Sequence, residues 1–294
     1  MERKPKILVQ LDSDPHASVF DSVVAVDSGV DHLFRHASVE PTQVRDLVHG
    51  TMFTRGPQDL HNTAIFLGGS DVNAGQTLLD QVTNCFFGPM RVSVMLDANG
   101  ANTTAAAAVL AASKHVELRG LSALVLAATG PVGQRIVRLL AREGAKVRVA
   151  SRNAERAEAV CKSIKRVVED APLSPVATDS ASCLTDAMEG VEAVFSAGAS
   201  GVQLLPEQQW TNHSNLKVAI DLNAVPPAGI EGIEATDKAV DRGGVACYGA
   251  IGVGGTKMKI HKAAIRQLFT TNDQVLDAEE IFAIGRQLAV ESGK

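Results

Sequence analysis

The stretch LVLAATGPVG, residues 124–133, places five apolar residues directly before a turn that contains glycine. An apolar run of this kind is typical of a strand buried on both faces of a parallel sheet. In the dinucleotide-binding fingerprint, three glycines serve the tight turn, the close approach of pyrophosphate and the packing of a helix on the strand. Gly130 and Gly133 take the second and third positions, and Ala128 takes the first. Because alanine has poor access to positive φ, we expect a turn that tolerates a Cβ at Ala128.

The residues after the turn favour a helix over 131–143 that begins at Pro131 and stops at Gly144. The start of such a helix offers free N–H groups and partial positive charge to a phosphate. An incomplete fingerprint is also compatible with a purely structural turn. The sequence of strand, helix and strand within about 30 residues favours the nucleotide loop.

Beyond Gly144 the alternation of strands and helices continues, with a second helix expected over 153–169. The expected strands are KVRVAS (146–151), VEAVFSAG (191–198), KVAIDLN (217–223) and GVACYGAIGVGG (244–255), the last running into a glycine-rich turn. This succession predicts a doubly wound, Rossmann-type nucleotide-binding domain.

The end of the second strand selects the nucleotide. A free ribose 2′-OH is usually met by Asp or Glu about 20 residues past the glycines. Here Ser151 and Arg152 stand at that place, and Arg156 follows. Two guanidiniums and a hydroxyl suit a 2′-phosphate, so the expected cofactor is NADP. The alternative is a solvated arginine at a strand end.

The first third of the chain alternates strand-like runs with polar, helix-like stretches. Strands are expected at 6–11, 63–69 and 91–97, a helix that Ser70 or Asp71 caps, and a helix over 102–116 capped by Asn102. A last helix, over 276–290, is expected to return to this first domain. The expected fold is therefore α/β with two domains: residues 1–116 with 258–294, and a Rossmann-type domain over 117–257.

Composition excludes several classes of protein. Hydrophobic residues make up 45% and charged residues 21%, an ordinary globular composition. The net charge of −5 and the 4% of aromatic residues argue against nucleic-acid partners. Four cysteines without paired spacing indicate neither a disulfide framework nor a metal site. No signal peptide or membrane span is evident, so a cytoplasmic location is expected.

Polar stretches lie where strands or turns end, but no Ser-His-Asp, Cys-His or metal-ligand arrangement emerges among them. They are SVFDSVV (18–24), FTRGPQD (53–59), LDANGANTT (96–104), DLNAVPPAGI (221–230) and GAIGVGGTKMKIHKA (249–263). With TGPVG and FSAGASGVQLLP, these blocks resemble the NADP-dependent methylene-tetrahydromethanopterin dehydrogenases of methylotrophic bacteria. The resemblance covers nearly the whole chain. Ala128 departs from it, because the family is expected to have glycine there.

The resemblance implies two domains with a cleft, a pterin substrate and a homo-oligomer, a trimer in the family. It also implies direct hydride transfer from the methylene carbon of methylene-tetrahydromethanopterin to nicotinamide C4. Because the pterin nitrogens supply the electronic push and no proton leaves, a general acid–base pair is not required. Holding the two carbons close and aligned is then the main task of the protein.

Roles carried over by resemblance fall into two groups. Lys257 matches the cleft lysine that orients the pterin, and the pterin side includes Asp21, Asp97, Asn99 and Thr103. The NADP side includes Thr129, Gly130, Pro131, Val132, Ser151, Arg152 and Arg156, and, near the nicotinamide, Ser196, Ala197, Gly198 and Asn223. Structural roles stay open as alternatives: Lys257 as a solvated charge, Asp97 and Asn99 as turn formers, and Asp21 as a helix cap. His261 is expected to be structural.

Two other functions stay open. A methylene-tetrahydrofolate dehydrogenase shares the reacting part of the substrate. Its bifunctional forms usually carry a Tyr-x-x-x-Lys pair for cyclohydrolase chemistry, whereas the sole tyrosine, Tyr248, is followed four residues later by Gly252. A catalytically silent NADP sensor would keep the nucleotide loop and Arg152 but lose the polar residues opposite.

Overall fold

The computed structural model describes residues 4–211 and 213–292. The chain divides into two compact units: unit 1, Met1–Thr103 with Met258–Lys294, and unit 2, Thr104–Lys257. The sequence favours domain boundaries at 116/117 and 257/258. These boundaries stay a prediction.

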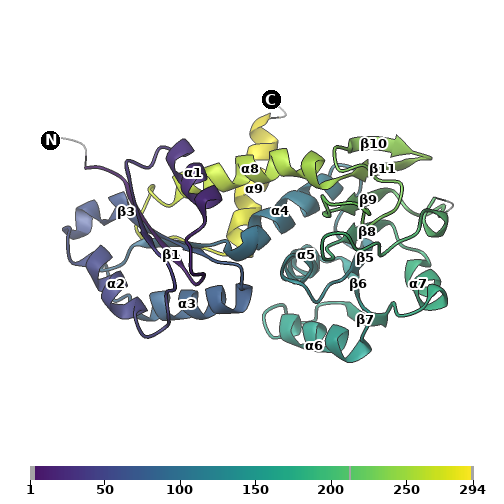
Figure 1. Cartoon of the computed structure of the whole chain (residues 1–294), viewed down its shortest axis with the longest axis horizontal. Helices are drawn as coiled ribbons and strands as arrows, with labels where there is room; N and C mark the ends of the chain where they lie inside the picture. The colour runs from purple at the N-terminus through teal and green to yellow at the C-terminus, as the bar shows by residue number, and fades with distance from the viewer. Residues whose placement is uncertain (1–3, 212, 293–294) are drawn as a thin grey trace. The chain divides into compact units, whose positions relative to one another are not determined.

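Unit 1 is built on a parallel five-stranded sheet, which Figure 1 shows with its labelled helices. The strand order is β12 (Val275–Leu276), β4 (Ser93–Leu96), β3 (Thr63–Gly68), β1 (Ile7–Asp12) and β2 (His32–His36). Helices α2 (Val44–Met52) and α3 (Val72–Asn84) pack on one face and bury a core with it, whereas α1 (Val19–Asp27) lies on the other side. Short 3₁₀ turns span Pro57–Asn62 and Ala98–Gly100.

The start of α3 follows from its cap. The Asp71 carboxylate accepts hydrogen bonds from the N–H groups of Asn73 (2.8 Å) and Ala74 (3.2 Å). These bonds satisfy donors that the first helical turn leaves without intrahelical partners. Of the two caps expected from the sequence, Asp71 is the one the structure uses.

Helix α4 (Ala101–Ala112) corrects a second capping prediction. Asn102 lies inside the helix instead of before it. Its buried amide donates to the carbonyl of Leu96 (2.6 Å) and to the Asp277 carboxylate (2.9 Å). The predicted cap was wrong because the turn Ala98–Gly100 already leads the chain into the helix, which frees Asn102 for longer-range bonds.

The glycine-rich segment after β11 (Val245–Tyr248) is also helical, where a turn was expected. Helix α8 spans Ala250–Gln267, and α9 (Ala278–Ser292) follows it. A Cβ at Gly252 would collide with the carbonyl oxygen of Asp237, and the N–H of Ile251 bonds to Ala235 O (2.8 Å). The glycines therefore let the start of α8 pack closely on the 235–237 backbone, and this packing offsets their low helix propensity.

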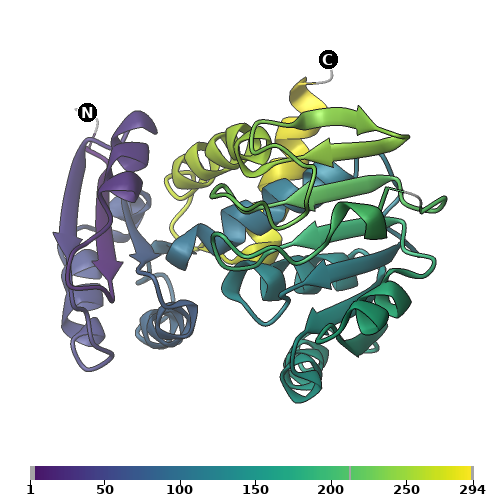
Figure 2. The same cartoon turned by 45° about the vertical axis from the view of Figure 1, so that its right-hand side comes forward.

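Unit 2 contains a seven-stranded sheet, which forms one continuous ladder in Figure 2. The order is β10 (Lys238–Arg242), β11, β9 (Val218–Asp221), β8 (Ala193–Ser196), β5 (Ser122–Leu126), β6 (Lys146–Ser151) and β7 (Leu173–Ala177). All neighbours are parallel except β10 and β11. Without β10, this is the strand order of dinucleotide-binding domains, with its reversal between β5 and β8.

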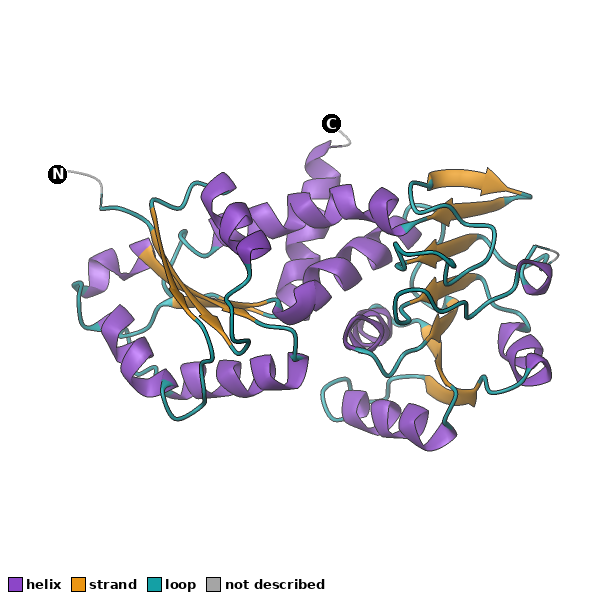
Figure 3. Cartoon of the chain, viewed as in Figure 1, coloured by secondary structure: helices purple, strands orange, loops and turns teal. Residues whose placement is uncertain are grey.

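Helices cover both faces of the unit 2 sheet, as Figure 3 shows. Helices α5 (Pro131–Arg142) and α6 (Ala154–Lys165) pack near β5, β6 and β7, and α7 (Ala181–Met188) lies on the opposite face from α5. A short helix, Glu207–Gln209, precedes the fully buried Trp210. The α/β, Rossmann-type fold expected from the sequence is confirmed.

Candidate functional site

The turn between β5 and α5 places its strained residue one position earlier than the sequence suggests. Ala127 has φ of +51°, in the left-handed region, whereas Ala128 is buried and donates its N–H to Ala150 O (2.9 Å). The tight turn therefore occurs at Ala127, and the absence of glycine at Ala128 does not disturb it. A left-handed alanine is unfavourable by roughly 1–2 kcal/mol.

The other two positions of the fingerprint, Gly130 and Gly133, lie at the start of α5. Gly130 is the N-cap of α5, and Pro131 occupies its first turn. A Cβ on Gly133 would lie 2.8 Å from both Ala127 O and Ala128 Cα, so glycine is required for the helix to rest on the strand end. Helix geometry gives the N–H groups of Val132 and Gly133 no intrahelical acceptor. This helix start is suited to an anion.

The end of β6 presents two guanidinium groups. The Asn153 side chain caps α6 by accepting from Arg156 N (3.0 Å), and Ser151 Oγ accepts from Asn153 N (3.2 Å). This turn fixes the backbone from which Arg152 and Arg156 extend. Both arginines are exposed, and within residues 4–211 and 213–292 neither guanidinium forms an ion pair.

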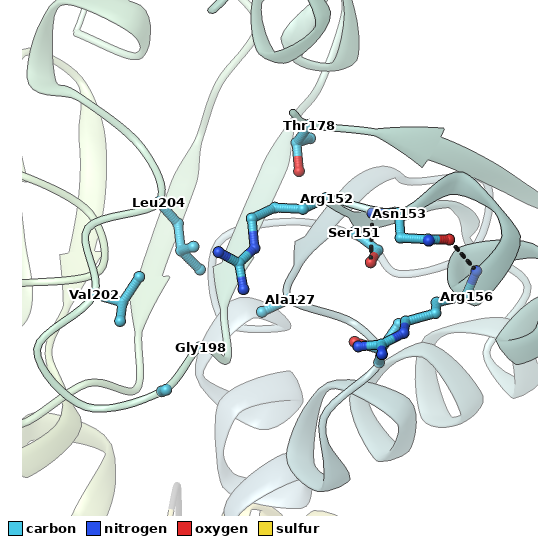
Figure 4. Close-up of a pocket in the computed structure, with 11 residues that line it drawn as sticks. Ala127, Ser151, Arg152, Asn153, Arg156, Thr178, Gly198, Val202 and Leu204 are labelled. Carbon is cyan, nitrogen blue, oxygen red and sulfur yellow. Dashed lines mark hydrogen bonds between the residues drawn. The ribbon is translucent and has the colours of Figure 1, made fainter. Parts of the chain in front are cut away.

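These features converge on a cavity of about 330 Å³. Figure 4 shows Arg152 extending into it from β6, towards Leu204. The cavity is lined by Ala127, Thr129, Ser151, Arg152, Asn153, Arg156, Thr178, Gly198, Ala199, Val202 and Leu204. It thus lies at the carboxyl ends of β5, β6, β7 and β8, where open parallel sheets bind their ligands.

Five of the predicted cofactor residues line this cavity: Thr129, Ser151, Arg152, Arg156 and Gly198. Sequence reasoning missed Thr178, which follows the unpredicted strand β7, and the apolar wall of Val202 and Leu204. The signal for that wall was present in FSAGASGVQLLP, because this segment follows a buried strand. A Cβ on Gly198 would lie 2.7 Å from Leu204 Cδ1, so a larger residue at position 198 would push the Leu204 side chain aside.

The other predicted cofactor residues lie outside the cavity lining. Gly130, Pro131 and Val132 form the adjacent helix start, and Ala197 follows β8. Ser196 is fully buried at the end of β8. Asn223 is nearly buried; its Oδ1 accepts from Val225 N (3.0 Å) and its Nδ2 donates to Pro227 O (2.9 Å), which holds the loop after β9.

A buried carboxyl group lies at the base of that loop. The Asp221 carboxylate, at the end of β9, accepts from the N–H groups of Gly229 (2.7 Å) and Ile230 (3.1 Å). Burial raises the pKa of Asp221, and the hydrogen bonds from Ile230, Asn223 and Gly229 oppose the rise. Asp221 therefore organises the 221–230 segment from inside.

In unit 1, three of the predicted pterin residues, Asp97, Asn99 and Thr103, follow the end of β4 along the chain. Asp97 and Thr103 are buried, with Asp97 accepting from Thr103 N (3.0 Å) and from Thr103 Oγ1 (2.7 Å). Asn99 is exposed with φ of +55°, and its N–H bonds to Gly69 O (2.6 Å). Asp21 lies in the first turn of α1, whose N-cap is Ser18. Asp97 and Thr103 thus support this edge from inside, whereas Asn99 lies at the surface.

The predicted pterin residue Lys257 is a half-buried residue of α8. The Tyr248 hydroxyl lies 2.8 Å from His115 Nε2, and burial raises the pKa of Tyr248. Among the residues that the structure describes, no three His, Cys, Asp or Glu side chains gather as metal ligands, and no helix has the length and apolarity to cross a bilayer.

Comparisons with known proteins agree with this geometry. Residues 19–99 match the N-terminal family of methylene-tetrahydromethanopterin dehydrogenases, and residues 127–268 match an NAD(P)H-binding family. The bifunctional protein MdtA of Methylorubrum extorquens is 45% identical over 287 residues, covering 97% of this chain and 99% of that protein. The chain belongs to the methylene-tetrahydromethanopterin dehydrogenase family.

Another relative from the same organism, an NAD(P)-dependent methylenetetrahydromethanopterin dehydrogenase, is 29% identical over 296 residues, covering 96% of this chain and 98% of that protein. Two solved structures share the fold. Shikimate 5-dehydrogenase from Listeria monocytogenes has a TM-score of 0.56 at 13% identity, covering 97% of this chain and 96% of its own. Quinate dehydrogenase from Corynebacterium glutamicum has a TM-score of 0.52 at 14% identity, covering 96% and 99%. The family resemblance noted in the sequence is confirmed.

Proposed function

We propose that this chain is an NADP-dependent oxidoreductase that converts methylene-tetrahydromethanopterin to methenyl-tetrahydromethanopterin by direct, reversible hydride transfer. The proposal rests on family membership together with one observation. At the end of β6, where a carboxylate would meet a ribose 2′-OH, the cavity is lined by Arg152 and Arg156 instead.

The residues present fit NADP. The start of α5 offers Val132 and Gly133 N–H groups to the diphosphate. Arg152 and Arg156 offer a fork of donors to the 2′-phosphate, because guanidinium groups match phosphate geometry. When bound, NADP supplies the hydride acceptor. Ser196, Ala197 and Asn223 then support the nicotinamide half by shaping the ends of β8 and β9.

On the pterin side, Lys257 orients the substrate through its carbonyl or a ring nitrogen. Asp21 and Asn99 contact the heterocycle. The buried Asp97 and Thr103 support the Asn99 turn from the interior of unit 1. The buried Asp97 carboxylate favours the positive charge that develops on the product electrostatically. No residue need take a proton, because hydride removal releases none. In this proposal residues 1–116 with 258–294 form the pterin domain and 117–257 the NADP domain.

The decisive test mixes purified protein, NADP and methylene-tetrahydromethanopterin and follows the rise of NADPH absorbance. Methylene-tetrahydrofolate and NAD serve as parallel substrates. We expect the largest kcat/KM with the methanopterin and NADP. Faster turnover of the folate would assign the chain to the folate dehydrogenases. NADP binding without turnover of either pterin would assign it to the silent NADP sensors.

For the assembly we propose a homo-oligomer, a trimer by family resemblance, that works in the cytoplasm. The physical support is an exposed apolar face on α1, where Val19, Phe20, Val23 and Val26 are each more than half exposed. Light scattering coupled to size exclusion measures the mass. A monomeric mass at micromolar concentration would contradict the assembly.

A further inference from the structure

His261 is a fully buried histidine in unit 1 to which the proposed chemistry gives no role. It lies on α8, and its ring stacks on Phe66 of β3, with centroids 5.7 Å apart and planes 16° from parallel. A second aromatic ring, Phe20 of α1, lies 6.3 Å away. The imidazole therefore joins three elements of unit 1: a strand and two helices.

The same imidazole faces a buried carboxylate. His261 Nδ1 lies 3.9 Å from Asp97 Oδ2, and both side chains are completely shielded from water. This distance exceeds that of a hydrogen bond, and the pair gains an ionic attraction only when the imidazole is protonated. On its other side, Asp97 is held by the N–H and hydroxyl of Thr103. A buried carboxylate needs such neighbours, because an uncompensated charge in the interior is strongly unfavourable.

The location of His261 connects residues of the proposed pterin side. Phe20, which its ring approaches, precedes Asp21, and the Asp97 loop continues into the exposed Asn99. Lys257 stands four residues before His261 on the continuous helix α8. Side chains four apart project from the same helix face. The buried His261 ring therefore contributes, with the other buried residues of α8, to the rotational setting of the helix that carries Lys257.

We propose that His261 is a positioning residue for the pterin. Its contact with Asp97 holds the part of α8 around His261 against the end of β4, and so keeps the Asp97–Asn99 loop in the geometry that binds substrate. This inference rests on the proposed function. His261 itself touches neither substrate nor cofactor and moves no proton.

The first experiment compares His261→Gln with a control, His115→Gln, which changes the histidine that contacts Tyr248 in unit 2. For His261→Gln we expect KM for methylene-tetrahydromethanopterin to rise about tenfold, with kcat within about twofold and the NADP dissociation constant unchanged. His115→Gln should alter none of the three. An unchanged KM, or a fall in melting temperature and kcat without a change in KM, would overturn the proposal.

The second experiment is a double-mutant cycle with Asp97→Asn, which keeps the side-chain shape and carries the test if His261→Gln does not fold. Asp97→Asn alone should raise KM in the same way, and it should also lower kcat, because it removes the carboxylate proposed to favour the developing positive charge. Combined with His261→Gln, it should add little to the rise in KM, because each change breaks the same contact. Fully additive effects would overturn the pairing. Absence of wild-type turnover would contradict the proposed function instead, so the two failures are distinguishable.

Discussion

In the proposed function, two side chains select the nucleotide that the cavity accepts. Arg152 reaches into the cavity from the end of β6, and Arg156 lines it from the first turn of α6. A 2′-phosphate forms charge-assisted hydrogen bonds with these two guanidiniums, whereas a neutral ribose hydroxyl forms only weaker ones. The discrimination between NADP and NAD should therefore reside in these two side chains.

Arg152→Ala should weaken NADP binding by roughly 10- to 100-fold, the loss expected for hydrogen bonds to a charged group, and leave NAD binding within about twofold. Fluorescence titration with both nucleotides measures the change. Arg166→Ala, at the other end of α6, is the matched control because Arg166 is exposed and outside the cavity lining. Equal losses for NAD and NADP would contradict the assignment.

Lys257 should serve the other ligand. Lys257→Ala is expected to raise KM for the pterin at least about tenfold and leave NADP affinity unchanged, because a lost contact to one substrate appears in that substrate's parameter. Lys259→Ala, an exposed lysine two residues later on α8, is the control. If Lys257→Ala weakens NADP binding alone, our division of the ligands is wrong.

The cysteines offer a test of burial through pH. Burial raises the pKa of Cys247 to about 12, and burial also raises that of Cys161. Since the thiolate is the reactive form, a thiol of pKa 12 is ionised to roughly one part in 10,000 at pH 8. Cys183, half-buried, is the comparison.

With iodoacetamide at pH 8, the half-buried Cys183 should be labelled in the folded protein, while Cys247 should stay unlabelled until urea unfolds the protein. Peptide mass spectrometry separates the two sites. Rapid labelling of Cys247 in the folded protein would show that unit 2 opens readily at β11.

At the scale of elements, the junction of β5 and α5 leaves no room for a side chain at position 133. Gly133→Ala would insert a Cβ against the backbone of Ala127 and Ala128. Overpacking of this kind lowers the free energy of unfolding by about 1–3 kcal/mol. It should also displace the helix start and weaken NADP binding.

Gly50→Ala is the matched control for Gly133→Ala. Gly50 lies in α2 with nothing within 4 Å of its added Cβ, so there alanine should stabilise by about 0.5–1 kcal/mol. Urea denaturation measures both. Equal effects at the two positions would show that the close approach at Gly133 is unimportant.

At the scale of the whole molecule, the chain leaves unit 1 after residue 103 and returns to it at residue 258. The return is secured in part by β12, which pairs with β4, and by the Asn102 amide, which bonds both Leu96 O and Asp277. The bond between Asn102 and Asp277 joins residues that lie 175 positions apart in the chain.

Asn102→Ala should therefore lower the free energy of unfolding by about 1–3 kcal/mol, because it leaves buried polar groups with fewer partners. Gln287→Ala, which removes an exposed bond to Glu291 within α9, should change it by less than about 0.5 kcal/mol. Urea unfolding followed by circular dichroism compares them. A loss for Asn102→Ala no larger than that of the control would show that the return of the chain is held elsewhere.

Much of this architecture was predictable because its signals are local. The five apolar residues 124–128 predict a buried strand. Gly130, Pro131 and Gly133, which follow them, predict the start of a helix. The arginines at the end of β6 follow at a spacing that the fold dictates. Strands β7 and β2 escaped prediction because both are edge strands: LSPVA contains Pro175, and HLFRH is largely exposed. Edge strands lack the doubly apolar pattern of central ones.

The sequence alone determined the α/β class, the nucleotide loop, the arginine pair and the family, since each depends on residues close together along the chain. Tertiary structure decided the rest. It moved the strained turn to Ala127, made a helix of the glycine-rich segment after Tyr248, and set Asn102 and His261 against partners more than 160 residues away. Such contacts depend on which elements pack together, and a short stretch of sequence carries no record of its distant neighbours.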